Sequence, residues 1–213
     1  LVSVLLFSLQ SHFLFITFIL VNPLFPVKMA KHLKDLLSEG RVSRFRRHFS
    51  IPANVHLSLV TDNTLDMERE DQNSIAFPLL SIAEGGLHFP LHPFLRAVLH
   101  YWGLILSQPN VNFFWIVMGI VELNRRLSND LGSPAIRHCY ALAKSSGRLG
   151  LHFLRAKDTD HHLVTMLASS GKRVDDVMVN IRGNWEFGEG EGRLDPIPRW
   201  RGEPGCRVAP CIY

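Results

Sequence analysis

The segment from Phe89 to Leu127 constrains the fold of this chain more than any other part of the sequence. His92 stands just before Pro93, a residue suited to the first turn of a helix, where its missing N–H has no partner to lose. Apolar residues then recur every three or four positions until Gly103, which readily takes the left-handed conformation that ends a helix. These apolar residues are Phe94, Leu95, Val98, Leu99 and Trp102. The pattern predicts an amphipathic helix that ends at Gly103.

A second helix is predicted after the turn at Pro109 and Asn110. Apolar residues again recur at near-helical spacing, and the far end carries Arg125 and Arg126, whose charges suit the negative end of the helix dipole. The apolar residues are Phe113, Ile116, Val117, Ile120 and Leu127. The two helices must bury these faces against each other or against a sheet.

Three shorter segments show features typical of strands, most clearly an alternation of apolar and polar residues. They are residues 55–60, residues 150–156 and residues 176–187, the last with a turn at Gly183 and Asn184. Together with the two helices, these segments predict an α+β fold with a mainly helical core and a few short strands.

The length of 213 residues is enough for one ordinary domain, since domains usually hold roughly 100 to 200 residues. We expect a single globular domain over residues 29–187, with an exposed acidic linker near residues 61–74. Residues 188–213 are rich in Gly and Pro, which predicts an extended or disordered tail.

Residues 1–28 form an apolar leader with no Asp, Glu, Lys or Arg before Lys28. A transmembrane helix needs about 20 apolar residues, so one interpretation is a membrane-spanning N-terminal helix. The other is translated sequence upstream of a true start at Met29. The polar residues 10–12 interrupt the apolar run and no basic flank precedes it, which favours the second interpretation.

A formal charge of +4 and a pI of about 9.2 permit weak attraction to phosphates. Basic residues gather around Phe45 and Phe49. The candidate nucleic-acid contacts in this cluster are Arg41, Arg44, Arg46 and Arg47. The alternative interpretation is an ordinary solvated basic face whose two phenylalanines are buried.

Three cysteines, Cys139, Cys206 and Cys211, occur at unrelated spacings. The sequence therefore predicts neither a disulfide framework nor a zinc motif, and it favours a reducing intracellular compartment.

No arrangement of residues indicates catalysis or a bound cofactor. His88 and His92 have the spacing of a helical metal pair, but Pro90 and Pro93 break the helix that such a pair needs. The segment GNWEFGEGEG is rich in Gly but acidic and lacks the GK[ST] ending of a phosphate loop, and no GxSxG motif occurs. We expect no catalytic residue, no metal and no cofactor, and hence no enzyme.

Several segments resemble plant gypsy-type transposon proteins, a gag-like or transposase-like group found beside plant retrotransposons. The matching segments are FPLHPFLRAVLHYWGL, SQPNVNFF, GIVELNRRL, RGNWEF and DPIPR, within a region from Phe45 to about Arg199. The residues that fall on the family's motifs are Phe89, Pro90, His92, Pro93, Phe94, Gly103, Asn110, Gly183, Asn184, Trp185 and Phe187. All are structural types of residue, used for helix entry, caps and core packing. One departure is Val111, where the family usually has Pro.

The resemblance implies a non-catalytic gag-like structural or interaction module that binds RNA or DNA at most weakly. It would associate with itself through the exposed ends of its helices, in the cytoplasm or nucleus. One alternative is a single-pass protein tethered to a membrane by residues 1–28, so a membrane is a partner only if that segment is genuine. A second alternative is a degenerate transposase fragment.

Overall fold

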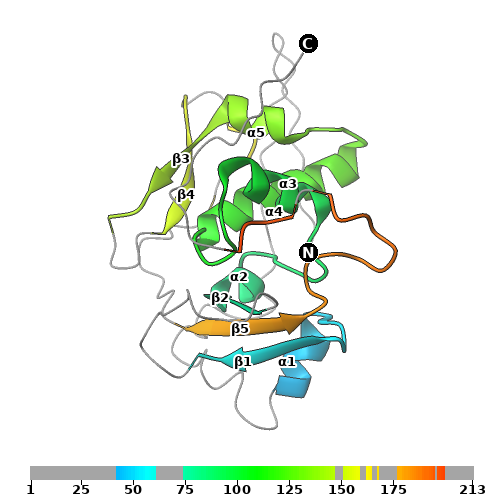
Figure 1. The fold of residues 1–213 in the computed structure, drawn as a ribbon. Coiled ribbons are helices and arrows are strands. Elements are labelled where there is room, and N and C mark those ends of the chain that lie inside the picture. Colours follow the sequence, from blue (N-terminus) through cyan, green and yellow to red (C-terminus); the bar gives the residue numbers. More distant parts are fainter. Residues whose placement is uncertain are drawn as a thin grey trace.

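A computed structural model of the chain describes residues 42–60, 74–146, 151–158, 162–164, 167, 177–194 and 196–199. Helices and short antiparallel strands follow one another in these residues (Figure 1). The helices are α1 (Val42–His48), α2 (Leu80–Ala83), α3 (Pro93–Trp102), α4 (Val111–Leu127) and α5 (Ser133–Cys139). The strands are β1 (Val55–Leu59), β2 (Ser74–Pro78), β3 (Tyr140–Lys144), β4 (His152–Ala156) and β5 (Met178–Gly183). The predicted α+β class is confirmed.

The predicted helices α3 and α4 begin and end where the sequence places them. The Nδ1 atom of His92 accepts a hydrogen bond from the N–H of Phe94 at 3.2 Å, and Gly103 ends α3 with a φ of 63°. The side chain of Asn110 caps α4 in the same way, since its Oδ1 accepts from the N–H of Phe113 at 3.2 Å. These caps satisfy N–H groups that a helix leaves unpaired, so local sequence decides the helix boundaries.

Strand β5 is the centre of an antiparallel sheet in the order β1-β5-β2. Figure 1 shows this sheet at the bottom of the molecule, with α3 and α4 above it and the two-stranded sheet formed by β3 and β4 beside α4. The predicted strand 55–60 corresponds to β1, and its alternation is confirmed, because His56 and Ser58 are exposed while the apolar residues are buried or half-buried. Residues far apart in the chain therefore form one sheet.

Strand β2 and helix α2 were not predicted. Their sequence, residues 74–83, is almost continuously apolar, and all five residues of β2 are buried. A continuous apolar run has no period by which a strand can be distinguished from a helix.

Strand β3 and helix α5 were also not predicted, whereas β4 lies within the predicted segment 150–156. The β3 sequence YALAK contains residues that favour helices, and it becomes a strand because it pairs with β4. Helix α5 has only seven residues, too few for a clear helical period.

The tail from Gly188, predicted to be extended or disordered, lies against the core in its described residues up to Arg199. These residues form no helix or strand in their described part, but they pack on the core: Ile197 is 3% exposed, and Nδ1 of His100 lies 2.9 Å from the carbonyl oxygen of Pro196. The globular part therefore extends past Phe187. The composition predicted the lack of regular structure but not the contacts.

Other predictions concern residues outside the described ranges. These include the leader 1–28, Arg41 and the acidic segment 61–73. Ser74, the last residue of the predicted exposed linker, is buried and begins β2. Within the described ranges, no helix is both long enough and apolar enough to cross a membrane.

Candidate functional site

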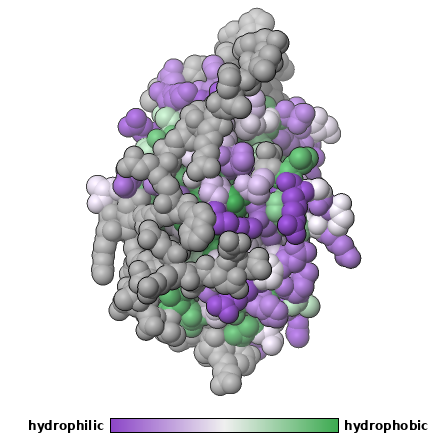
Figure 2. Space-filling model, in the orientation of Figure 1, coloured by the Kyte–Doolittle hydropathy of each residue, from purple (hydrophilic) through white to green (hydrophobic). Residues whose placement is uncertain are grey.

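Helix α1 carries the described part of the basic cluster. Phe45 is buried and its ring centre lies 4.6 Å from that of Phe49, which holds the apolar side of the helix against the core. Arg44 and Arg47 are exposed, and the first turn of α1 has no acidic residue. Figure 2 shows mostly hydrophilic residues along the right-hand edge of the visible face. The buried phenylalanine agrees with both interpretations of the cluster.

Arg46 differs from its neighbours because its guanidinium points inward. It donates hydrogen bonds to the carbonyl oxygens of Pro52 and Val55. The N–H of Val60 bonds to the carbonyl oxygen of Met178 in the adjacent strand β5. Successive residues of an antiparallel strand direct their backbone groups to opposite edges, so Val55, five positions before Val60, directs its N–H and C=O to the outer edge of β1. Arg46 therefore covers the Val55 end of this strand edge, and the guanidinium N–H groups that bond to Pro52 and Val55 are occupied. Arg44 and Arg47 are the described arginines of the cluster that can meet a ligand.

Two of the segments that carry the family resemblance, FPLHPFLRAVLHYWGL and RGNWEF, lie side by side. The N–H of Leu91 donates to the carbonyl oxygen of Trp185 at 3.1 Å, although the two residues are far apart in the sequence. Trp185 is 2% exposed and Phe89 is also buried. Gly183 supplies the turn before Trp185, with a φ of 93° and Asn54 O only 2.1 Å from where a Cβ would stand. The motif residues thus build one packed junction.

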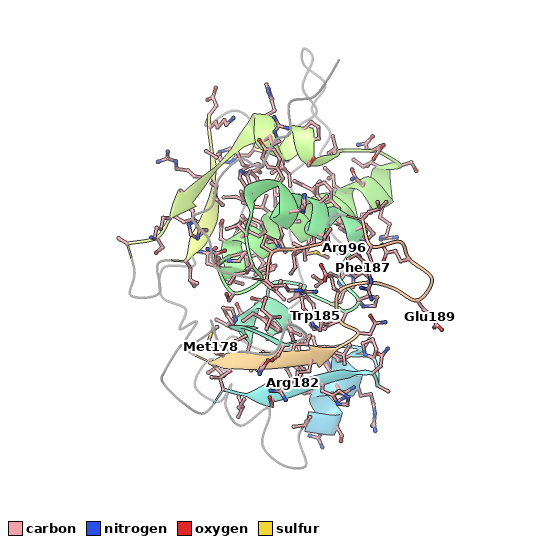
Figure 3. The ribbon with its side chains drawn as sticks, viewed as in Figure 1. Arg96, Met178, Arg182, Trp185, Phe187 and Glu189 are labelled. Atoms are coloured by element: carbon pink, nitrogen blue, oxygen red, sulfur yellow. The ribbon has the colours of Figure 1, made fainter. Side chains whose placement is uncertain are left out.

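Arg96, which was not among the predicted site residues, is the centre of this junction (Figure 3). It is 3% exposed, and Nη1 donates to the carbonyl oxygens of Leu91 at 3.1 Å and Glu186 at 2.9 Å. Nη1 and Nη2 also donate to the two carboxylate oxygens of Glu191. The guanidinium carbon lies 4.5 Å from the ring centre of Phe187. We call these five residues the Arg96 cluster.

Glu191 is held in its charged form within the Arg96 cluster. Hydrogen bonds from Arg96, and then the N–H of Gly188 at 2.8 Å, lower the pKa of the Glu191 carboxyl to about 2. A general acid or base needs a pKa near the working pH. Glu191 does not meet this requirement, so the geometry favours a structural ion pair.

A second arginine–carboxylate pair lies next to the first. The Glu186 side chain is 4% exposed; one of its oxygens accepts from the N–H of Ile197 at 2.7 Å and the other from Arg199. The guanidinium carbon of Arg199 lies 4.7 Å from the ring centre of Trp185. The two pairs fasten residues 186–199 to α3 and to the turn after β5.

His92 caps α3 and borders the Arg96 cluster. Burial lowers the pKa of His92, and the nearby charges of His88 and Arg96 lower it further, while Glu191 opposes them. Its Nδ1 already accepts the N–H of Phe94. No group of three or more His, Cys, Asp or Glu side chains in the described part of the chain could hold a metal ion.

The sequence analysis missed Arg96, Glu186 and Glu191. Arg96 stands beside the apolar positions Leu95 and Leu99 of α3, and such a charge at the border of an apolar face needs a partner. The acidic residues of the segment 183–192 could have supplied it. Nothing local identifies which carboxylate is used, because the pairing depends on the path of the chain after β5.

Comparisons of the chain with family models, curated proteins and solved structures give no match. The resemblance to gypsy-type transposon proteins therefore stays a hypothesis.

Proposed function

We propose that this chain is a non-catalytic, gag-like interaction module of gypsy-type retrotransposon origin that binds RNA or DNA weakly through α1. Arg44 and Arg47 supply the charge for phosphate contacts, which depend on charge and not on base sequence. The weak affinity follows from the small number of free arginines.

The observation that supports this proposal is that some residues of α1 attach the helix to the core while others are exposed to solvent. Phe45 and Arg46 attach the helix to the core and to β1, while Arg44 and Arg47 are exposed and make no ion pair within the described residues. By contrast, Arg125 and Arg126 at the end of α4 are both paired with Glu122. Arginines on an anchored helix that have no ion pair among the described residues can meet phosphates without first giving up such a partner.

Binding of labelled RNA and DNA to the full chain at several salt concentrations tests the proposal. We expect Arg44→Ala with Arg47→Ala to weaken binding and to lower the slope of log affinity against log salt by about 2, one for each lost phosphate contact. The matched control is Arg125→Ala with Arg126→Ala, which removes the same charge from a surface whose arginines are already paired. Equal loss in both double variants would contradict a site on α1. No binding by the unmodified chain at low salt would contradict the proposed function itself.

A further inference from the structure

Strand β3 has one edge with no partner in the described part of the chain. It pairs with β4 along its other edge, and hydrogen bonds from Lys157 to Cys139 and from Ser145 to Leu151 continue the ladder at both ends. In an antiparallel ladder, successive residues direct their backbone groups to opposite edges. Cys139 and Ser145 bond towards β4, so Ala141 and Ala143, which lie two positions from them, do the same. The N–H and C=O of Leu142, which lies between these two residues, therefore point away from β4.

The other strand edges are covered at least in part. Arg46 occupies the Val55 end of the outer edge of β1, while Leu57 and Leu59 lie on the rest of that edge. Strand β2 is buried along its length and ends with Pro78, which has no N–H to donate. In β3 only Tyr140 is buried, and the strand contains neither a proline nor a bulge that would block pairing. Proteins usually cover or interrupt such an edge, because it is a template for another strand.

Figure 1 shows β3 and β4 together at the edge of the molecule. Helix α4 packs against β4, and α5 leads directly into β3. An added strand can therefore approach β3 from the side opposite β4.

We infer that β3 pairs in antiparallel fashion with β3 of a second copy of this chain, about a two-fold axis at Leu142. The N–H of Leu142 in each copy then donates to the C=O of Leu142 in the other copy. This reciprocal pairing is the self-complementarity that a two-fold interface requires. The two copies form one four-stranded sheet in the order β4-β3-β3-β4.

The side chains of β3 suit a second copy. Ala141 faces Ala143 of the other chain, so small side chains meet beside the axis. Lys144 faces Tyr140 of the other chain. The two Lys144 residues are therefore separated by four residue positions, about 13 Å along the strand. Like charges are thus kept apart, as a self-pairing edge requires.

This interface is independent of nucleic-acid binding by α1. It also differs from self-association through helix ends, which the sequence analysis predicted, because backbone groups of a strand make the contact.

Disulfide trapping in the full chain tests the register. In the proposed pair the two Leu142 Cα atoms are about 5.5 Å apart, within the roughly 7 Å that a disulfide can span. We expect Leu142→Cys to form a covalent dimer under mild oxidation. Lys144→Cys, its matched control, should form no more dimer than the unmodified chain, whose own cysteines set the background.

Light-scattering mass as a function of concentration tests the role of the backbone. Leu142→Pro removes an N–H that has no partner among the described residues, so the mass should fall to that of a monomer while the far-ultraviolet circular dichroism is unchanged. Leu142→Ala keeps the N–H and should remain dimeric. A dimeric Leu142→Pro variant, or equal trapping at positions 142 and 144, would overturn the inference. So would a monomeric unmodified chain, and if Leu142→Pro fails to fold, the trapping experiment decides.

Discussion

Arg96 in α3 and Glu191 after β5 are 95 residues apart in the sequence, and both carboxylate oxygens of Glu191 accept hydrogen bonds from the Arg96 guanidinium. The same guanidinium bonds to the carbonyl oxygens of Leu91 and Glu186. One buried side chain thus joins the entry to α3, the turn after β5 and the segment that follows. Two-point pairs of this kind fix geometry as well as charge.

We predict that Arg96→Met lowers the free energy of unfolding by about 1 to 3 kcal/mol for each buried acceptor left without a donor. Methionine fills part of the volume but donates no hydrogen bond. Urea unfolding measures the change, with Arg125→Met as the control. Arg125 forms an exposed pair with Glu122, so its loss should cost much less than the loss of Arg96. Similar losses in the two variants would contradict a central role for Arg96.

The stabilising effect of Glu191 should depend on pH. Its pKa is about 2 in the folded protein and 4.5 ordinarily, chiefly because of the hydrogen bonds from Arg96. A lowered carboxyl pKa gives stability that is fully present above pH 4.5 and is lost as the pH falls towards 2. The stability difference between the unmodified chain and Glu191→Gln should therefore shrink over this range.

Unfolding curves at pH 7 and at a pH near 3 measure this difference. The control is Glu189→Gln, since Glu189 is exposed and makes no ion pair within the described residues. A difference for Glu191→Gln that is the same at both pH values would show that its charge is not the cause.

Gly183→Ala should destabilise the protein strongly. The φ of Gly183 is 93°, and an added Cβ would stand 2.1 Å from the carbonyl oxygen of Asn54. Holding a non-glycine residue in such a conformation costs about 1 to 3 kcal/mol before the clash is counted. Gly192→Ala is the matched control, because its Cβ would meet no atom within 4 Å. Thermal unfolding of both variants gives the comparison, and equal midpoints would contradict the prediction.

Trp102→Ala should lower the free energy of unfolding by about 3 to 5 kcal/mol, the usual cost of removing a large buried aromatic side chain. Trp102 is 8% exposed, and its ring centre lies 6.2 Å from that of Phe113, which joins α3 to α4. Tyr101→Ala, at a half-buried neighbour, should cost less. A negligible shift for Trp102→Ala in urea unfolding would mean that its packing contributes little.

The sequence by itself determined the elements whose ends depend on neighbouring residues. His92, Gly103 and Asn110 bound α3 and α4 through hydrogen bonds and backbone conformations within a few residues of each helix end. The alternation in β1 likewise lies within a single short segment, whereas the alternation predicted for β5 is not seen in its burial, because Met178 to Ile181 are all buried. The exposed arginines of α1 could also be named from sequence, but the inward position of Arg46 could not, because its acceptors lie in the next element.

The tertiary structure decided where local preferences were weak or opposed to the outcome. The Ala-rich β3 is a strand because β4 lies beside it, and β2 is a strand because β5 does. The choice of Glu191 as the partner of Arg96 depends on the path of the chain after β5. So does the packing of the Gly-rich segment, which composition predicts only to be extended or disordered. A buried charge stabilises whichever distant segment brings a carboxylate within hydrogen-bond reach, and only the assembled fold specifies which segment that is.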